Sequence, residues 1–351
     1  MNYSEKIKQI EYWFGEPGPL TDVVLSTRVR MSRNLESFPF ARYLKEEQRR
    51  DLEQQIRDYC SSFRKEYRLF NLSRISRLEK QILQERYLLH PDFCRRRDAL
   101  VYLNEPEGKT ISVCDRDHLH LTAFRSGFPL LELTEMISRE KTLLEEQLSL
   151  AADEELGWLT HSLTDTGLGM KYSVILHLPG ICLTGEMPLW QQEALEKKCL
   201  LEDFDWNGRH HRYPAGMLQL FNITSFFRRE TELTSLIRSL TDRLITRELE
   251  LRERIRKGEF PKIEDLVYRA WGLLKYGRMI NQEESFQALS YLRLGIILGW
   301  VSGPDPALVT RLLGLVQDGH MKKLFSLEKP VPDDDNFIKS FRGEFLRKVL
   351  R

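Results

Sequence analysis

The sequence has 351 residues, with 53 Lys and Arg against 52 Asp and Glu, and its formal net charge is +1. This balance argues against a nucleic-acid binder, which needs a basic surplus, and no apolar run approaches the roughly 20 residues of a membrane-spanning helix. A hydrophobic fraction of 41% is enough for a buried core. The start, Met1–Lys6, lacks the apolar core of a signal peptide, and the cysteines form no CxxC pair. We therefore expect a cytoplasmic protein with reduced thiols and no structural zinc.

The chain begins with helical and extended segments. Ser4–Phe14 is predicted as a short amphipathic helix, and Gly15–Pro19 ends it. Val23–Leu25 is a brief extended apolar run. Lys45–Gln84 is dense in charged residues with apolar positions at helical spacing, which predicts two or three surface helices.

Strands are predicted in the middle of the chain. Alternating or apolar runs bounded by turn residues indicate strands at Ala99–Leu103, Thr110–Val113, His118–Phe124, Tyr172–Leu178 and Ile181–Thr184. His177 is expected to be a packed histidine of one such strand. Between them, Leu130–Leu150 is predicted as a helix with a charged outer face.

Helices are predicted to close the chain. Thr224–Lys257 has the pattern of one long charged helix, with Thr224 or Ser225 as its N-cap and an outer face that is either solvated or meets a partner subunit. Ile263–Val316 indicates several further helices, and the tail ends in a basic amphipathic one. Strands in the middle with helices on both sides predict an α+β fold.

Two arginines on the first extended segment form a candidate anion-binding pair. Arg28 and Arg30 are two positions apart, so on a strand both side chains point to the same face. Two guanidinium groups on one face make a good clamp for phosphate oxygens. Paired arginines are more often part of a solvated or ion-paired surface, so the pair alone is a weak signal.

Three later segments carry polar groups suited to a site. Cys114–His120 gathers acids, a base and imidazoles after a strand, and Trp158–Val174 enters a strand through two glycines and Lys171, where backbone can approach phosphates. Asn207–Tyr213 is a basic loop. A polar turn, a non-specific Gly-x-Gly pair and a solvated loop are the plainer explanations when each segment is taken alone.

Taken in order, these segments resemble the ATP:guanidino phosphotransferase (phosphagen kinase) family, and within it the bacterial protein arginine kinases of the McsB type. Val24–Leu35 is similar to the family's first nucleotide-binding segment, and Asp115–His120 stands where the family has Glu-Glu-Asp-His-hydrophobic-Arg. Thr160–Thr184 resembles the segment around the reactive cysteine. Glu264–Ile280 and Leu292–Gly295 resemble the C-terminal helical region.

The resemblance implies transfer of the γ-phosphoryl group of Mg-ATP to a guanidinium nitrogen, with several arginines and magnesium neutralising the phosphates. No residue of the chain is predicted as a metal ligand. It implies a phosphagen kinase-like fold, with a central, mostly antiparallel sheet flanked by helices. It divides the chain into an N-terminal helix at residues 1–20, a catalytic domain at 21–255 and a C-terminal helical domain at 256–351. The nucleotide-binding positions that it implies are Ser26, Thr27, Arg28, Val29, Arg30, His120, Lys171, Tyr172, Ser173, Val174 and Ile175.

The acceptor side departs most from the family pattern. Arg116 replaces the central glutamate of Glu-Glu-Asp, and Ser162 replaces the reactive cysteine. At about 4 Å and an effective dielectric near 20, a charge pair is worth about 4 kcal/mol, so Arg116 turns attraction of the acceptor guanidinium into repulsion. A serine supplies no thiolate at neutral pH. Asp115 and Asp117 remain as candidate catalytic carboxylates.

Other family positions have changed as well. His120 and Lys171 stand in place of arginines, the first of them mostly neutral near pH 7, and Tyr87 stands in place of a histidine. Asn207 and Arg212 replace an arginine and a glutamate of the late loop. The tail has Asp335–Ser340 where protein arginine kinases carry an Arg-Asp-x-x-Arg-Ala motif that binds phosphoarginine, which argues against phosphoarginine sensing.

These departures predict a degenerate kinase, or pseudokinase, that acts as a regulator or adaptor, with ATP or ADP and Mg²⁺ as ligands. The resemblance implies a zinc-binding activator protein and the Clp unfoldase–protease as partners, and we also expect protein substrates and a homodimer. One alternative is an active phosphotransferase in which Asp115 or Asp117 replaces the lost carboxylate, acting on protein arginine or another guanidino acceptor. Another is an interaction module with an empty nucleotide cleft.

Overall fold

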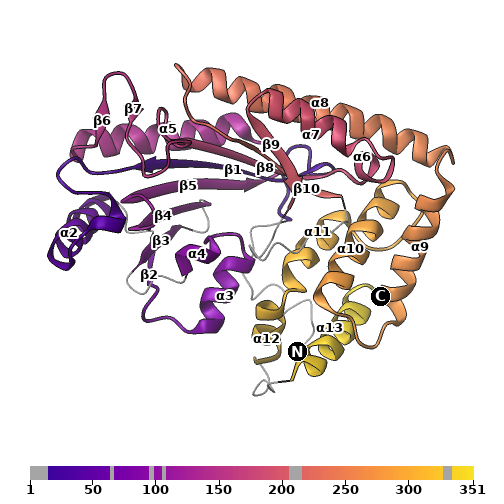
Figure 1. Cartoon of the computed structure of the whole chain (residues 1–351). Coiled ribbons are helices and arrows are strands. Elements are labelled where there is room, and N and C mark those ends of the chain that lie inside the picture. Colours follow the sequence, from indigo (N-terminus) through magenta and orange to yellow (C-terminus); the bar gives the residue numbers. More distant parts are fainter. Residues whose placement is uncertain (1–14, 64–66, 95–98, 105–107, 205–215, 327–333) are drawn as a thin grey trace.

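The computed structural model describes residues 15–63, 67–94, 99–104, 108–204, 216–326 and 334–351 (Figure 1). The predicted helix Ser4–Phe14 lies outside these ranges. Within them, a large sheet has helices on both sides, and the C-terminal helices pack under one end of it. The described part of the chain therefore has the α+β architecture, with a flanked antiparallel sheet, that the sequence predicts.

The large sheet is antiparallel throughout. The strands of the described residues are β1 (Val24–Arg33), β2 (Arg68–Asn71), β3 (Leu100–Asn104), β4 (Lys109–Val113), β5 (Leu119–Ser126), β6 (Ala152–Asp153), β7 (Gly157–Trp158), β8 (Met170–His177), β9 (Cys199–Asp203) and β10 (Met217–Asn222). Eight of them form one sheet in the order β2-β3-β4-β5-β1-β8-β10-β9, while β6 and β7 form a small separate hairpin.

Helices cover the sheet and make up the C-terminal part. They are η1 (Ala41–Tyr43), α2 (Glu46–Phe63), α3 (Arg77–Glu85), α4 (Pro91–Cys94), α5 (Leu130–Gln147), α6 (Pro179–Leu183), α7 (Met187–Glu196), α8 (Glu230–Arg256), α9 (Pro261–Tyr276), α10 (Gln282–Ile297), α11 (Pro306–Leu315), α12 (Asp318–Ser326) and α13 (Asp335–Val349). Among the described helices, none combines the length and the apolar character that crossing a bilayer requires.

Strand β1 lies in the middle of the sheet and pairs with β5 on one side and β8 on the other. The predicted extended run Val23–Leu25 thus leads into a ten-residue strand that begins at Val24. Pairing with β5 and β8 keeps the polar residues after Leu25 extended. Residue propensity alone does not predict a strand of this length. Val29 is fully buried, whereas Arg28 and Arg30 on either side of it are partly exposed. The two arginines share one face, as the alternation predicts.

The two faces of the sheet are covered differently. Helices α5 and α8 lie across one face (Figure 1), where side chains such as Val29 and Val174 form the largest apolar cluster. On the other face, α3 and α4 pack over the β2–β4 end. At the opposite end, Leu25, Ile175 and Met217 join the core of the C-terminal helices. Between these two coverings lies the part of the sheet that carries Arg28 and Arg30.

One predicted strand is wrong. The segment Ile181–Thr184 belongs to helix α6 and its C-cap rather than to a strand. Pro179 stands at the start of this helix, where its missing N–H costs nothing. The carboxylate of Glu248 on α8 accepts hydrogen bonds from the Gly180 and Ile181 amides, each at 3.0 Å. That carboxylate lies 68 residues away from Gly180, so the local sequence carries no sign of it.

The predicted start of the long helix is also wrong. Helix α8 begins at Glu230, with Arg229 as its N-cap residue, instead of at Thr224 or Ser225. The Ser225 hydroxyl accepts a hydrogen bond from the Met170 amide at 2.7 Å and so fixes the start of β8. Ser225 thus serves the start of β8, and the N-cap Arg229 makes no side-chain hydrogen bond to the helix.

Candidate functional site

The site is built on the face of the sheet that carries the two arginines. In the antiparallel register, Arg28 of β1 lies opposite Ser173 of β8, and Arg30 lies opposite Lys171. On the β5 side, Ser32 lies opposite His120. Side chains of paired residues project to the same face. The fold therefore brings together Arg28, Arg30, Lys171 and Ser173, as the resemblance implies, and places His120 one pair further along.

The remaining predicted nucleotide-binding residues lie differently. The side chains of Thr27, Val29, Tyr172 and Val174 are buried on the face covered by α5 and α8. Tyr172, for example, donates a hydrogen bond to Glu230 of α8 at 3.1 Å. Ser26 is buried and Ile175 packs against the C-terminal helices. The four side chains under α5 and α8 do not face the space between Arg28 and Lys171. For all six residues a nucleotide-binding role stays a prediction.

Arg28 has donors that the described residues leave unused. Its guanidinium carbon lies 3.9 Å from the ring centroid of Tyr87 and 5.8 Å from that of Phe124. Its Nε and Nη2 are shielded from solvent and have no hydrogen-bond partner among the described residues. Burial lowers the pKa of this guanidinium to about 10. A shielded cation with unused donors is costly alone, and phosphate oxygens are the acceptors that satisfy such a fork best.

Tyr87 is held over Arg28 by its own contacts. Its backbone has a left-handed conformation, with φ of 57°. Its hydroxyl accepts a hydrogen bond from Gln219 Nε2 of β10 at 2.8 Å, and its ring meets Phe204 edge-on with centroids 5.2 Å apart. A residue at the end of α3 is thus part of the site. Gln219 and Phe204 were not predicted, and no local motif marks them.

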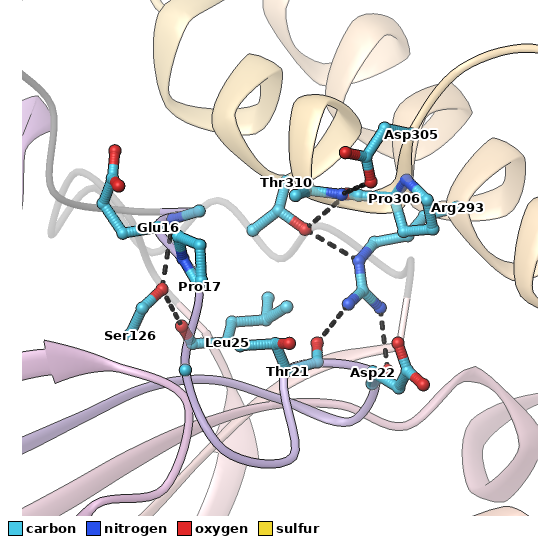
Figure 2. A pocket seen from close by; sticks show the side chains of 13 residues that line it. Glu16, Pro17, Thr21, Asp22, Leu25, Ser126, Arg293, Asp305, Pro306 and Thr310 are labelled. Atoms are coloured by element: carbon cyan, nitrogen blue, oxygen red, sulfur yellow. Dashed lines mark hydrogen bonds between the residues drawn. The ribbon is translucent and has the colours of Figure 1, made fainter.

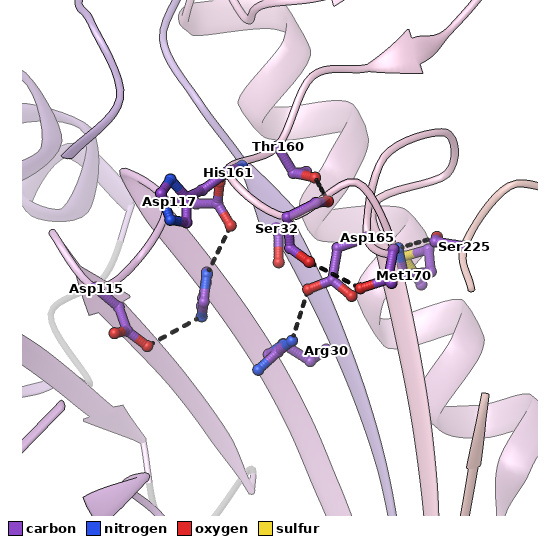
Figure 3. Close-up of polar contacts among 12 residues, drawn as sticks. Arg30, Ser32, Asp115, Asp117, Thr160, His161, Asp165, Met170 and Ser225 are labelled. Carbon is purple, nitrogen blue, oxygen red and sulfur yellow. Dashed lines mark hydrogen bonds and ion pairs between the residues drawn. The ribbon is translucent and has the colours of Figure 1, made fainter. Parts of the chain in front are cut away.

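The other two cations of this face also have internal partners. Arg30 Nη2 lies 3.1 Å from Oδ2 of Asp165, in the turn before β8 (Figure 3). Lys171 Nζ lies 4.4 Å from the ring centroid of Phe221. Burial lowers the pKa of Lys171 to about 8, and the charge of Asp165 partly opposes this shift.

His120 lies between two carboxylates. Its Nε2 is 3.2 Å from Oδ2 of Asp117, and its Nδ1 is 3.5 Å from Oδ2 of Asp115 (Figure 3). Both ring nitrogens therefore lie beside a carboxylate oxygen. In this arrangement the ring serves the two aspartates rather than an external anion.

Asp117 is a buried anchor of this region. Its side chain accepts hydrogen bonds from Asn34 Nδ2 at 2.7 Å and from the His161 amide at 2.6 Å, in addition to the His120 contact. Burial opposes its ionisation, but these donors outweigh burial and lower its pKa to about 2. Asp117 is therefore ionised at neutral pH, with its oxygens already engaged, and it fixes the loop that leads to Ser162.

The two substituted acceptor-side positions, Arg116 and Ser162, have different surroundings. The Arg116 side chain is 59% exposed, and its Nη2 is 3.6 Å from Oδ2 of Asp92 on α4. Ser162 stands in the turn before β8, with its Oγ 2.8 Å from that of Thr164. Its carbonyl accepts hydrogen bonds from the Thr160 hydroxyl and the Asp165 amide. Asp165, three residues after Ser162, is the charged residue of this turn that the sequence analysis missed.

No metal cage is formed by the described residues, because they contain no group of three His, Cys, Asp or Glu side chains placed to hold an ion. Magnesium bound through nucleotide phosphates and few protein ligands is compatible with such a surface. Asn207 and Arg212 lie outside the described residues.

A cavity of about 250 Å³ lies away from this face, between the segment Gly15–Leu25 and helices α10 and α11 (Figure 2). Arg293 lines it and directs its guanidinium to Thr310 Oγ1 and to the carbonyls of Thr21 and Asp22. Because these donors are already engaged with the protein, the cavity is a structural junction rather than a second cationic site.

Comparison with known proteins identifies the family of this fold. The model of the ATP:guanido phosphotransferase C-terminal catalytic domain matches residues 51–251, and that of the protein-arginine kinase McsB C-terminal domain matches residues 261–351. A protein-arginine kinase of Bacillus velezensis is 30% identical, covering 89% of this chain and 86% of its own. One of Halothermothrix orenii is 27% identical, covering 98% and 97%.

Solved structures agree at the level of the fold. A crystal structure of lombricine kinase superposes with a TM-score of 0.58 at 17% identity, over 71% of this chain and 75% of that one. The duplicated taurocyamine kinase of Schistosoma mansoni, with bound transition state analog components, gives 0.59 at 19% identity, over 70% of this chain. The match spans 35% of the duplicated enzyme's length. The chain belongs to the ATP:guanido phosphotransferase family, among the protein-arginine kinases of the McsB type.

Proposed function

We propose that this chain is a nucleotide-binding regulator or adaptor derived from the protein-arginine kinases, with little or no phosphoryl transfer to arginine. The observation that carries this proposal is the state of the carboxylates. Asp117 is engaged by Asn34, His120 and the His161 amide, and Asp115 faces His120. An acceptor guanidinium must be held and deprotonated by carboxylates, and these two already serve other groups.

The nucleotide half of the proposal is supported by Arg28. Its shielded Nε and Nη2 lack partners among the described residues, and Arg30 and Lys171 extend the same positive strip. The family points to ATP or ADP with Mg²⁺ as the ligand, and bound Mg-ATP would supply the γ-phosphoryl group. In such a complex Arg28 would hold phosphate oxygens by its fork, while Lys171 would act as a point charge.

The acceptor half is supported by two substitutions. Arg116 puts a cation where the resemblance implies a carboxylate, although its 59% exposure screens the repulsion. Ser162 offers a hydroxyl bonded to Thr164 where the resemblance implies a thiolate. Together they remove both groups that would hold the acceptor guanidinium and assist its reaction.

The proposed setting follows from the family. Relatives named protein-arginine kinase indicate protein partners. We propose a zinc-binding activator protein and the Clp unfoldase–protease as partners, a homodimer as the assembly and the cytoplasm as the location. We also propose that residues 21–255 and 256–351 act as catalytic-type and helical domains.

A second candidate is an active phosphotransferase with a rearranged site. It is favoured by the match of named protein-arginine kinases over nearly the whole chain. In that case Asp115 or Asp117 would leave its present contacts and serve the acceptor, on protein arginine or on another guanidino compound.

Two measurements on the purified full chain test the proposal. Thermal unfolding with Mg-ADP measures binding, and a ligand at 100 times its Kd stabilises by about 2.7 kcal/mol. Labelled ATP with a protein substrate measures transfer. We expect a thermal shift that Arg28→Ala abolishes, and no labelled phosphoarginine. Absence of any shift would favour an interaction module with an empty cleft, and Arg28-dependent labelling would favour the active enzyme.

A further inference from the structure

Asp165 forms an ion pair with Arg30 on the cationic face. Its Oδ2 lies 3.1 Å from Arg30 Nη2, and the side chains are only 15% and 31% exposed, respectively. Arg30 lies opposite Lys171 on β8, and Asp165 also acts electrostatically on Lys171. A single carboxylate thus pairs with Arg30 (Figure 3) and attracts the charge of Lys171.

The turn that carries Asp165 is fixed on both sides. The amides of Asp165 and Thr166 donate to the Ser162 carbonyl at 2.9 and 3.2 Å. The Ser225 amide donates to the Thr164 carbonyl at 2.7 Å. Gly167 pairs with Trp158 of β7 through two backbone hydrogen bonds. These contacts hold the backbone of the turn, so the fold keeps Asp165 within reach of Arg30.

The two arginines of the strip differ in this respect. Arg28 is covered by the neutral rings of Tyr87 and Phe124, and it keeps unused donors. Arg30 also keeps a shielded Nε without a partner among the described residues. Its Nη2, however, meets the Asp165 carboxylate, which is the same kind of acceptor as a phosphate oxygen. A phosphate that approached Arg30 would have to displace this carboxylate and would meet its negative charge.

We propose that Asp165 is an autoinhibitory carboxylate that competes with polyphosphate for Arg30, so that the strip binds nucleotide fully only when the Arg30–Asp165 pair separates. This inference rests on the proposed nucleotide-binding function. It adds that the chain's affinity for polyphosphates is set from within, by a residue of the Ser162 turn. A partner that moved this turn would change nucleotide affinity without touching the nucleotide.

The substitution Asp165→Asn tests the proposal because it removes the charge and keeps the shape and the turn amide. Calorimetry of the full chain would measure the Kd of Mg-ADP and, separately, of inorganic tripolyphosphate. We expect Asp165→Asn to bind both about tenfold more tightly than the unaltered chain, since the competing charge is gone. Asp265→Asn is the matched control, because it removes a carboxylate from an arginine pair (Arg269, 2.7 Å) on exposed α9.

If Asp165 competes for Arg30, the tighter binding by Asp165→Asn must also depend on Arg30. We expect the double variant Asp165→Asn with Arg30→Met to lose the tenfold gain, and thermal unfolding of each variant checks that it folds. If the unaltered chain binds Mg-ADP and Asp165→Asn binds it no better, the autoinhibitory role is wrong while the proposed function stands. If only tripolyphosphate binding improves and Mg-ADP binds to neither form, the competition is real and the nucleotide proposal fails.

Discussion

The guanidinium of Arg293 on α10 donates a hydrogen bond to Nδ1 of His177 at the end of β8, with the two nitrogens 2.8 Å apart. Since arginine can only donate, Nδ1 must accept, and the proton of the ring resides on Nε2, which donates to Ser290 Oγ at 2.9 Å. His177 is therefore neutral in the folded protein. It is a packed strand histidine, as predicted, and it joins the sheet to the C-terminal helices.

This contact predicts an acid-sensitive fold. Burial, followed by the charges of Arg293 and Arg252, lowers the pKa of His177 well below its usual value near 6.5. Below about pH 6.5 the unfolded chain binds a proton that the folded chain does not, so stability is complete above that pH and falls as the pH drops. The slope is up to about 1.4 kcal/mol per pH unit for one such histidine. Urea unfolding between pH 7.5 and 5 measures it.

The variant His177→Gln should flatten this slope. Burial also lowers the pKa of His118, so part of the slope will remain. Asp117 does not interfere, because its pKa of about 2 places its loss of stability below about pH 4. If the variant does not fold, NMR titration of the unaltered chain serves instead. A His177 ring that became protonated near pH 6.5 would contradict the assignment.

The Arg293 side chain should contribute strongly to stability. It donates to Thr310 Oγ1 at 2.8 Å and to the Asp22 carbonyl at 2.9 Å, and it is fully buried. Arg293→Met leaves buried acceptors without donors, so we expect a loss of about 3 kcal/mol in the free energy of unfolding. Arg269→Met, which removes an exposed arginine of α9, should cost under about 0.5 kcal/mol. Equal losses of unfolding free energy in the two variants would contradict a structural role of Arg293 between the Gly15–Leu25 segment and the C-terminal helices.

Glu85, at the end of α3, makes a second contact with the C-terminal helices, in addition to the contact between His177 and Arg293. Its carboxylate accepts hydrogen bonds from the Gly319 and His320 amides at 2.8 and 2.9 Å, at the start of α12. Glu85→Gln exchanges a charged cap for a neutral one, and we expect a loss of about 1 kcal/mol by urea unfolding. Glu344→Gln, on the exposed face of α13, is the control, and a comparable loss there would contradict the capping role.

Lys171 should give nucleotide binding a pH dependence. Its pKa of about 8, lowered by burial, means that it loses its charge between pH 7 and 9. Because the charged form attracts phosphate, we expect the Kd of Mg-ADP to rise up to roughly tenfold over that range. Lys171→Arg should keep the affinity nearly constant, since arginine stays charged. A rise that persists in Lys171→Arg would assign the effect to another group.

The cationic face could be predicted from the sequence because it depends only on the alternation of side chains along single strands. Arg28 and Arg30 alternate with Val29 on one strand, and alternation is enough to put them on one face. Lys171 and Ser173 follow the same rule on β8. The segments themselves could be aligned with a known family, so the fold was predicted along with them.

The rest of the site depends on contacts between distant parts of the chain. Tyr87 reaches Arg28 through Gln219, which lies 132 residues away, and Asp165 reaches Arg30 across 135 residues. Helix α6 depends likewise on Glu248, and its sequence alone indicated a strand. Local pattern reports which residues share a face, whereas it does not report which side chain fills the space above that face.

An assay of phosphoryl transfer decides whether this chain has kept the kinase activity of its family. The purified chain is incubated with γ-labelled Mg-ATP and a protein substrate, and acid-labile phosphoarginine is quantified, with an active protein-arginine kinase as the positive control. The engaged Asp117, the Arg116 cation and the Ser162 hydroxyl predict no phosphoarginine above background, at nucleotide concentrations that saturate binding. Phosphoarginine that forms with the unaltered chain and disappears with Arg28→Ala would contradict the account.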